Sequence, residues 1–272
     1  MRYGHHTSDG KISIDSAAVF CDVLQNRNPL AINNFEEFLK DCEALVKSEF
    51  NPSQGAFNNV RGNWYEWLIS VGSLHYFNSH SLSQIILPLP NVRSLDYMSL
   101  YVDEIYKFIE DLRNKTTIED VSLISSNPDY AIIKKTEQLL LPNLSTVSTS
   151  TIFEIDNCYK QLLRKLEFSD LIGFASIKTS LRPDRRLQLS HEGALVKAFY
   201  EHLKGRLWQV DAAGVKYYGV AMGVKDSDRE GLKTVATHSI LSVNTKPEAA
   251  VDAVYEINSG AGLYNFLNEI LV

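Results

Sequence analysis

Ionisable side chains are concentrated in the segment 176–192, which reads S-I-K-T-S-L-R-P-D-R-R-L-Q-L-S-H-E. The apolar run Leu171–Lys178 ends in a lysine, three arginines follow, and Glu192 opens an apolar pattern at helical spacing. A lysine can hold a phosphate group or help to activate water, and carboxylates can bind a divalent cation. These residue types point to metal-assisted hydrolysis of a phosphodiester, provided that the fold brings them together.

Ser176 and Lys178 are two residues apart in the apolar run. In a strand, both side chains leave the same face of the sheet. A single lysine at the end of such a strand more often extends its ammonium group into solvent. The arginines and acids nearby favour a functional lysine instead.

Glu192 is followed at helical spacing by Leu195, Val196, Phe199 and Leu203. In a helix the glutamate would therefore share the apolar face. A carboxylate on that face must be paired, protonated or bound to a metal. The alternative is a place in the first turn, where an acid interacts favourably with the helix dipole and still reaches water.

Two further carboxylates could join this set. Asp129 follows Pro128, which fixes φ and removes a backbone donor, so Asp129 stands where a strand begins or in a simple turn. Glu66 lies between Trp64 and Trp67 and could be only a polar residue beside an aromatic helix face. If the elements converge at one sheet edge, a few carboxylates with water and phosphate would suit Mg²⁺.

The arginine segment carries groups that can read bases. The planar forks of Arg182, Arg185 and Arg186 can bond guanine O6 and N7, and Asp184 can accept from cytosine N4. The alternative is a solvated loop with internal arginine–aspartate pairs. The net charge of −6 argues against a protein that coats nucleic acid unselectively, but it allows a basic cleft in an acidic body.

Length and composition set the frame. A chain of 272 residues with 44% hydrophobic content is expected to be globular, and we predict one elaborated domain. The chain has no apolar run of the roughly 20 residues that a membrane span needs, and its N-terminus is polar, so we expect a cytoplasmic protein. The three cysteines have no metal-ligand spacing and are predicted to be reduced.

Hydrophobic periodicity predicts an α/β (α+β) protein whose strand 171–178 is central and covered on both faces. Helices are expected at 15–24, 34–49 (with Asn34 as the cap), 62–71, 100–112, 154–166, 190–203, 247–257 and 262–271. Strands are expected at 85–89, 171–178, 215–224 and 234–243, with a strand, turn and strand over 121–133. A polar insertion is expected around 142–151.

Several motifs in order along the chain resemble a known family. Asn127-Pro-Asp129, Ser176-Ile-Lys178 and Glu192 resemble a permuted PD-(D/E)xK nuclease motif, in which a helix glutamate replaces the acid two residues before the lysine. The remaining matches are Gly62–Trp67, 178–188, 191–193 and 232–239. Together they are similar to the type IIF restriction endonucleases that cut purine-CCGG-pyrimidine sites.

This resemblance implies roles for individual residues. Asp129 and Glu192 would be the metal-binding carboxylates, Lys178 the catalytic lysine, Ser176 the occupant of the usual acidic position, and Glu66 an accessory acid. The CCGG core would be read by an R-x-D-R motif consisting of Arg182, Asp184 and Arg185, with Arg186 beside it. Trp208 would lie between two dimers, and segment 58–62 is a candidate reader of the outer base pair. Asn63 departs from the aspartate expected there.

The resemblance also implies a fold and an activity. The fold would be a restriction-endonuclease-like core with a mixed central sheet flanked by helices, divided into a helical region at about 1–115, a catalytic sheet core at about 116–245 and C-terminal helices at about 246–272. The activity would be Mg²⁺-dependent cleavage of double-stranded DNA by a homodimer or homotetramer, alongside a cognate methyltransferase in a prokaryotic cytoplasm. An inactive DNA-binding protein of the same fold, or a repair or nicking nuclease, are the alternatives.

Overall fold

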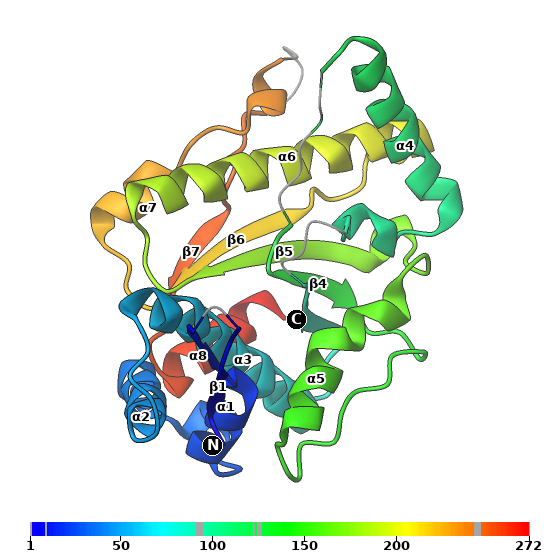
Figure 1. Ribbon diagram of the computed structural model, residues 1–272. Coiled ribbons are helices and arrows are strands. Elements are labelled where there is room, and N and C mark those ends of the chain that lie inside the picture. The colour runs from blue at the N-terminus through cyan, green and yellow to red at the C-terminus, as the bar shows by residue number, and fades with distance from the viewer. Residues whose placement is uncertain are drawn as a thin grey trace.

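A five-stranded mixed sheet lies between layers of helices in the computed structural model, which describes residues 2–8, 10–90, 95–121, 123, 127–241 and 246–271 (Figure 1). The strands of this sheet are β3 (Gln84–Pro88), β4 (Tyr130–Lys134), β5 (Leu171–Lys178), β6 (Lys216–Ala221) and β7 (Ala253–Glu256). The helices are α1 (Ser16–Leu24), α2 (Phe35–Lys47), α3 (Gln54–Ser79), α4 (Asp103–Ile118), α5 (Thr149–Asn157), α6 (Pro183–Leu207), α7 (Asp226–Leu232) and α8 (Gly260–Ile270).

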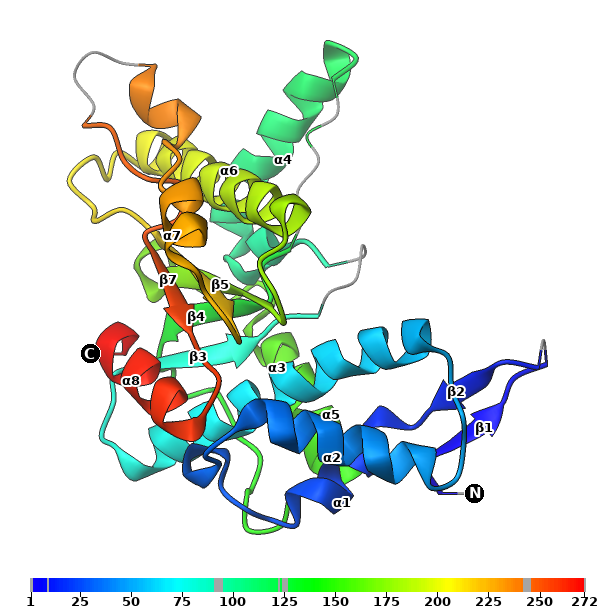
Figure 2. The ribbon, with the colours of Figure 1, turned by 90° about the vertical axis from the view of Figure 1, so that its left-hand side faces the viewer.

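The strands are ordered β3-β4-β5-β6-β7, with antiparallel pairing on the β3 and β4 side of β5 and parallel pairing on the β6 and β7 side. Helix α6 runs along one face, while α3, α5 and α8 lie on the other (Figures 1 and 2). The predictions of a mixed α/β fold and of a central strand at 171–178 are confirmed. The continuous apolar run is explained by the burial of β5 on both faces.

Strand register places two predicted site residues at one edge of the sheet. Tyr130, the first residue of β4, pairs with Ala175 of β5. Asp129 therefore stands beside the last residues of β5, where Lys178 ends the strand. Since β6 pairs in parallel with β5 and Ser176 lies opposite Gly219, the same edge is continued by β6.

Helix α3 is longer than the predicted 62–71 and supplies much of the core. It begins at Gln54, where the Ser53 side chain accepts from the Ala56 amide. Trp64, Leu68 and Val71 are fully buried, as their helical spacing predicts. The N-terminal half of α3 lies next to the sheet edge that carries Asp129.

Helix α6 begins at Pro183, seven residues before the predicted Ser190. Pro183 at the first helical position and Asp184 in the first turn are both start signals, and the preceding Arg182 is extended. The interpretation of this charged segment as a loop was wrong. Its side chains are instead held on a helix that continues to Glu192.

Two C-terminal predictions were also wrong. In the predicted strand 234–243, Val235 forms only an isolated bridge with Ala249, and residues 237–240 form a 3₁₀ turn; residues 242–245 lie outside the described residues. The predicted helix 247–257 contains β7, which pairs in parallel with β6. The spacing of apolar residues in both segments is compatible with either a helix or a strand. In the second segment, pairing with β6 made the strand the stable conformation.

Most of the remaining helices and strands lie close to their predicted bounds. Helices α1, α2 and α8 match their predictions, and Asn34 caps α2 through the Glu37 amide. Helix α4 extends past the predicted end, to Ile118. Helix α5 starts inside the expected polar insertion, because Ser148 caps it, and ends at Asn157 before a 3₁₀ segment. Of the expected strand, turn and strand over 121–133, β4 forms, whereas residues 122 and 124–126 lie outside the described residues.

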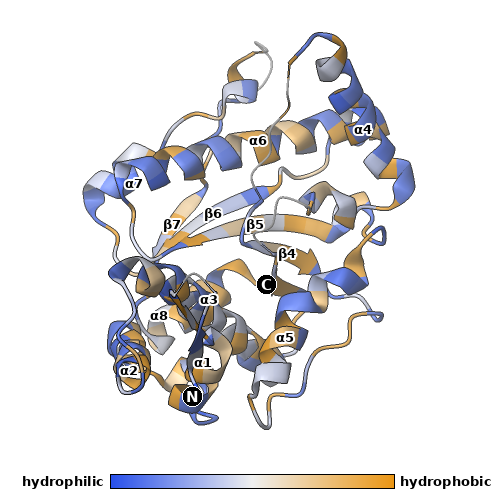
Figure 3. Cartoon of the chain, viewed as in Figure 1, coloured by the Kyte–Doolittle hydropathy of each residue, from blue (hydrophilic) through white to orange (hydrophobic). Residues whose placement is uncertain are grey.

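The sequence did not indicate the two-stranded hairpin of β1 (Gly4–His6) and β2 (Ile12–Ile14), which projects from the helical layer (Figure 2). Apolar residues gather along β4, β5 and β7, whereas α7 and much of α4 are hydrophilic (Figure 3). Within the described part of the chain, no helix is both long and apolar enough to span a membrane.

Candidate active site

A polar cleft of about 580 Å³ opens between the N-terminal half of α3 and the carboxyl-terminal end of β5. From α3 it is lined by Asn58, Asn59, Arg61, Gly62, Asn63, Tyr65 and Glu66. From the sheet edge and the start of α6 it is lined by Asp129, Ile177, Lys178, Thr179, Ser180, Arg182 and Arg185. The cleft thus joins residues that are far apart in sequence. Of the predicted site residues it includes Glu66, Asp129, Lys178, Arg182 and Arg185, but not Ser176, Asp184 or Glu192.

Asp129 and Lys178 form a buried pair in this cleft. Asp129 Oδ2 accepts hydrogen bonds from the Ile177 amide at 2.6 Å and from Lys178 Nζ at 2.9 Å. The Asp129 side chain is 4% exposed and that of Lys178 only 11%. Lys178 is therefore not extended into solvent, and Asp129 is more than a turn residue. Burial raises the pKa of Asp129, while the lysine opposes that rise.

Glu192 lies within the protein, and both of its carboxylate oxygens are hydrogen-bonded. Oε2 accepts from Ser176 Oγ at 2.9 Å and from the Tyr217 hydroxyl at 2.6 Å, and Oε1 accepts from Gln188 Nε2 at 2.8 Å. Its side chain is 1% exposed, and it lies in the third turn of α6. The alternative of a solvated first-turn acid is thereby excluded, and a small Ser176 on β5 leaves the space that the glutamate occupies.

Two of these partners were not predicted from the sequence. Gln188 precedes Glu192 by one helical turn, a spacing that could have been noticed had α6 been extended to Pro183. Tyr217 comes from β6, and no local pattern links it to Glu192.

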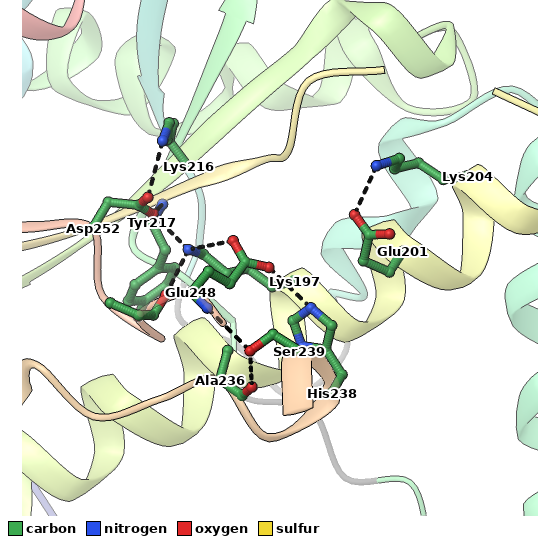
Figure 4. Close-up of polar contacts among 11 residues, drawn as sticks. Lys197, Glu201, Lys204, Lys216, Tyr217, Ala236, His238, Ser239, Glu248 and Asp252 are labelled. Carbon is green, nitrogen blue, oxygen red and sulfur yellow. Dashed lines mark hydrogen bonds and ion pairs between the residues drawn. The ribbon is translucent and has the colours of Figure 1, made fainter. Parts of the chain in front are cut away.

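Tyr217 reaches Glu192 because α6 carries Gly193 at the point of contact. A Cβ atom at position 193 would lie 2.8 Å from Tyr217 Cδ1 and 2.1 Å from the Ala250 carbonyl oxygen, so any other residue would push β6 and α6 apart. The Tyr217 backbone is held by Asp252, whose Oδ2 accepts from the Tyr217 amide at 2.8 Å and lies 2.9 Å from Lys197 Nζ (Figure 4).

We expect Tyr217→Phe to lower the free energy of unfolding by about 1.5–3 kcal/mol, because a buried carboxylate is deprived of a donor. Denaturant unfolding in EDTA measures this change. Tyr218→Phe is the matched control, since the Tyr218 ring packs edge-on against Tyr255 rather than against Glu192. An equal destabilisation in both variants would contradict a specific role for the Tyr217 hydroxyl.

Glu66 lies on α3 facing Asp129 across the cleft. Burial raises its pKa to about 8, with a further contribution from repulsion by Asp129 and an opposing one from Lys178. Behind it, burial raises the pKa of Asp156 to about 6, although Trp67 Nε1 donates to that carboxylate. A carboxyl group with a pKa of about 8 is protonated at neutral pH, and a cation bound beside Glu66 would favour its ionised form.

The carboxylates of the cleft fit a divalent cation that keeps some of its water. Among the described residues, no three His, Cys, Asp or Glu side chains are grouped closely enough to hold a metal by themselves. Mg²⁺ binds through one or two carboxylates and takes water and phosphate as its other ligands, so a complete protein cage is not required. Asp129 and Glu66 line the cleft, whereas Glu192 is buried beside Ser176. Besides burial, repulsion by Glu192 raises the pKa of Asp129. A cation held by Asp129 and Glu192 would balance their charge.

The predicted base readers lie at the start of α6. Arg182 Nη2 is 3.4 Å from Asp184 Oδ2, and Arg185 Nε is 3.9 Å from the same oxygen. Arg182 and Arg185 line the cleft, and all three side chains are well exposed. Arg186 instead pairs with Asp228 Oδ1 of α7 at 3.1 Å and is not among the cleft residues.

The remaining predicted residues lie at the margins or outside the cleft. In segment 58–62, every residue except Val60 lines the cleft. The Arg61 guanidinium is also paired with Glu36 and Glu43 of α2, at 2.7 and 2.5 Å. Trp208 follows α6 in a left-handed conformation and is 88% exposed, far along the helix from the site.

Comparisons with known proteins agree with this geometry. Residues 4–272 match the Cfr10I/Bse634I restriction endonuclease family. The type II restriction enzyme Cfr10I of Citrobacter freundii is 39% identical over 273 residues, spanning 98% of this chain and 95% of that protein. The structure of the Bse634I restriction endonuclease superposes with a TM-score of 0.88 and is 31% identical in sequence. The structure of Bse634I with cognate DNA superposes with a TM-score of 0.87 and is 29% identical. Each match covers 98% of this chain and 96% of the Bse634I chain.

Proposed function

Because the chain belongs to the Cfr10I/Bse634I family of type II restriction endonucleases, which are site-specific deoxyribonucleases, we propose that it cuts double-stranded DNA at purine-CCGG-pyrimidine sites with the aid of Mg²⁺. The observation that carries this proposal is the shared cleft. It holds the buried Asp129–Lys178 pair at its sheet edge and exposes Arg182 and Arg185 beside it. Chemistry and base recognition would therefore act on one bound duplex.

Asp129 and Glu192 would hold the ion, which would neutralise charge at the scissile phosphate and activate a water molecule as the nucleophile. Lys178 would bond a non-bridging phosphate oxygen or orient the attacking water. Ser176 and Tyr217 fix Glu192, so that its carboxylate does not have to reorganise during the reaction. Glu66 would act as an accessory acid across the cleft.

Arg182, Asp184 and Arg185 would read the CCGG core in the major groove. In the free protein Arg182 and Arg185 both lie near Asp184, and Arg185 also donates to Gln188. On binding, these charged groups would form contacts to guanine and cytosine edges. Arg186 would contribute positive charge or fix α7 through Asp228. Asn58 and Asn59 remain candidates for contacts to the outer base pair.

The proposal extends to products and assembly. Cleavage after the first base would leave four-base 5′ overhangs, with a 5′-phosphate on each product. A palindromic site matches a two-fold dimer, and two dimers would form a tetramer. We place this single-domain protein in a prokaryotic cytoplasm together with a cognate DNA methyltransferase, because unmodified chromosomal sites would otherwise be cut.

The exposed Trp208 is proposed to lie at the contact between two dimers. We expect Trp208→Glu to shift the particle from tetramer to dimer in sedimentation or light scattering, because a charge cannot be buried there unpaired. Phe153→Glu is a control, since Phe153 is another exposed aromatic residue, on α5. A tetramer that persists in Trp208→Glu would place the contact elsewhere.

Digestion of plasmids tests the proposed function directly. Plasmids with and without purine-CCGG-pyrimidine sites are incubated with the protein in Mg²⁺ or EDTA, and the ends are sequenced. Discrete Mg²⁺-dependent fragments ending at those sites are expected. Specific complexes without cleavage under any divalent metal would favour an inactive DNA-binding protein, and random nicking would favour a repair nuclease.

A further inference from the structure

Gln188 connects a predicted base reader to a predicted metal-binding carboxylate. Its amide oxygen accepts from Arg185 Nη1 at 3.2 Å, and its amide nitrogen donates to Glu192 Oε1 at 2.8 Å. The three residues are spaced by three and four positions on α6, so they follow one another along one face of the helix. A continuous hydrogen-bonded chain therefore runs from the exposed cleft side chain to the buried carboxylate.

Gln188 donates to a different carboxylate oxygen of Glu192 than the other two donors do. Ser176 and Tyr217 both bond Oε2, whereas Gln188 bonds Oε1. An ionised carboxylate offers about four acceptor positions, so these three contacts leave one position, on Oε1, for a further ligand. Gln188 thus orients the oxygen that retains acceptor capacity.

At the exposed end of this hydrogen-bonded chain, the orientation of the Arg185 guanidinium depends on what it binds. This guanidinium is about half exposed in the cleft and contacts Gln188 and, at 3.9 Å, Asp184. A bidentate bond to guanine would fix the plane of the guanidinium, whereas a wrong base would leave it unconstrained. The Gln188 amide oxygen, and hence its amide nitrogen, would be held in place only in the first case.

We propose that Gln188 couples base recognition by Arg185 to the position of Glu192, so that a correct CCGG core strengthens binding of the divalent cation. This inference rests on the proposed function, which assigns Arg185 to the bases and Glu192 to the metal. Only an amide of this length can accept from the arginine and donate to the glutamate at once. By reciprocity, the cation also strengthens binding of the correct DNA.

Four dissociation constants measure this coupling without any cleavage. Fluorescence anisotropy gives the affinity for a CCGG duplex and for a duplex with one core base pair changed, each in EDTA and in Ca²⁺. For each duplex, the dissociation constant in EDTA divided by that in Ca²⁺ gives the gain in affinity from Ca²⁺. The coupling factor is this gain for the CCGG duplex divided by the gain for the altered duplex. Any general effect of Ca²⁺ on DNA binding that does not depend on the base sequence cancels in this ratio.

For the wild-type protein we expect a coupling factor of about 10 or more, within the usual range of linked binding events. Gln188→Met removes both hydrogen bonds and should reduce the factor to about 1–2. Gln188→Lys can still donate to Glu192 but cannot accept from Arg185, and it should abolish the coupling as well. Gln161→Met is the matched control, because Gln161 also uses both amide atoms, but with the Leu140 backbone away from the cleft.

Three outcomes would overturn the inference. A coupling factor in Gln188→Met equal to that of the wild-type protein, or restored coupling in Gln188→Lys, would show that Gln188 only supports Glu192. A wild-type factor near one, despite preference for the CCGG duplex, would show that no coupling exists. A wild-type protein without that preference would refute the proposed function itself. Thermal unfolding of each variant in EDTA confirms that folded proteins are compared.

Discussion

Lys178→Ala is expected to reduce cleavage by about 10³-fold while leaving specific binding to CCGG DNA in Ca²⁺ intact, as for removal of a positioned catalytic or charge-stabilising group. Lys178 Nζ lies 2.9 Å from the buried Asp129 carboxylate and faces the cleft. The substitution takes away the positive charge beside the proposed scissile phosphate, but it leaves Arg182 and Arg185 in place. Single-turnover cleavage and anisotropy on the same labelled duplex measure the two effects.

Lys134→Ala is the matched control for this variant. Lys134 ends the neighbouring strand β4, and its ammonium group donates to Ser169 at 3.1 Å. Removing one partner of a buried ion pair can cost about 3–5 kcal/mol of stability, so circular dichroism must establish that Lys178→Ala is folded. Cleavage retained by folded Lys178→Ala would remove the lysine from the catalytic machinery.

Arg185→Ala is expected to have the largest effect on specificity, reducing discrimination between the CCGG duplex and one with an altered core base pair by about 1–3 kcal/mol for each base that the arginine reads. Arg185 is the exposed cleft arginine that also contacts Gln188. Its replacement should also slow cleavage of the correct site if Gln188 couples recognition to Glu192. Competition binding in Ca²⁺ and cleavage of both duplexes in Mg²⁺ provide the measurements.

Arg206→Ala separates base recognition from general charge. Arg206 lies at the opposite end of α6 and pairs with Asp111 at 3.3 Å, so its replacement removes the same charge without touching the cleft. Weaker binding to all duplexes in both variants, with unchanged discrimination in Arg185→Ala, would indicate that Arg185 contacts phosphates rather than bases.

The arrangement explains how one short unit could serve recognition and cleavage. Strand β5 ends at Lys178 and α6 begins at Pro183, so little chain separates the buried catalytic candidates from the exposed arginines. Helix α6 then returns across the sheet and brings Glu192 back to Ser176. The rigidity of one strand and one helix fixes the relative positions of the two functions.

The sequence by itself determined the elements whose burial follows a simple period. The uninterrupted apolar run 171–178 could satisfy its surroundings only as a strand covered on both faces, and α1, α2 and α8 carry apolar stripes with local caps. A partner could be predicted in the same way for Glu192, because a carboxylate on an apolar helix face must be paired, protonated or bound to a metal. Asp129 and Lys178 stood out only together with the other charged residues. The resemblance of several motifs to one family then limited the possible functions to one class of enzyme.

Only the tertiary structure decided which side chains meet. The Tyr217–Glu192 contact joins β6 to α6, and its close approach depends on Gly193 and on a carbonyl from residue 250. Strand β7 resembles a helix in its local pattern and becomes a strand because β6 offers it a free edge. Local periodicity reports how much of a segment is buried, whereas contacts between distant segments depend on strand pairing and helix packing, which no short stretch of sequence encodes.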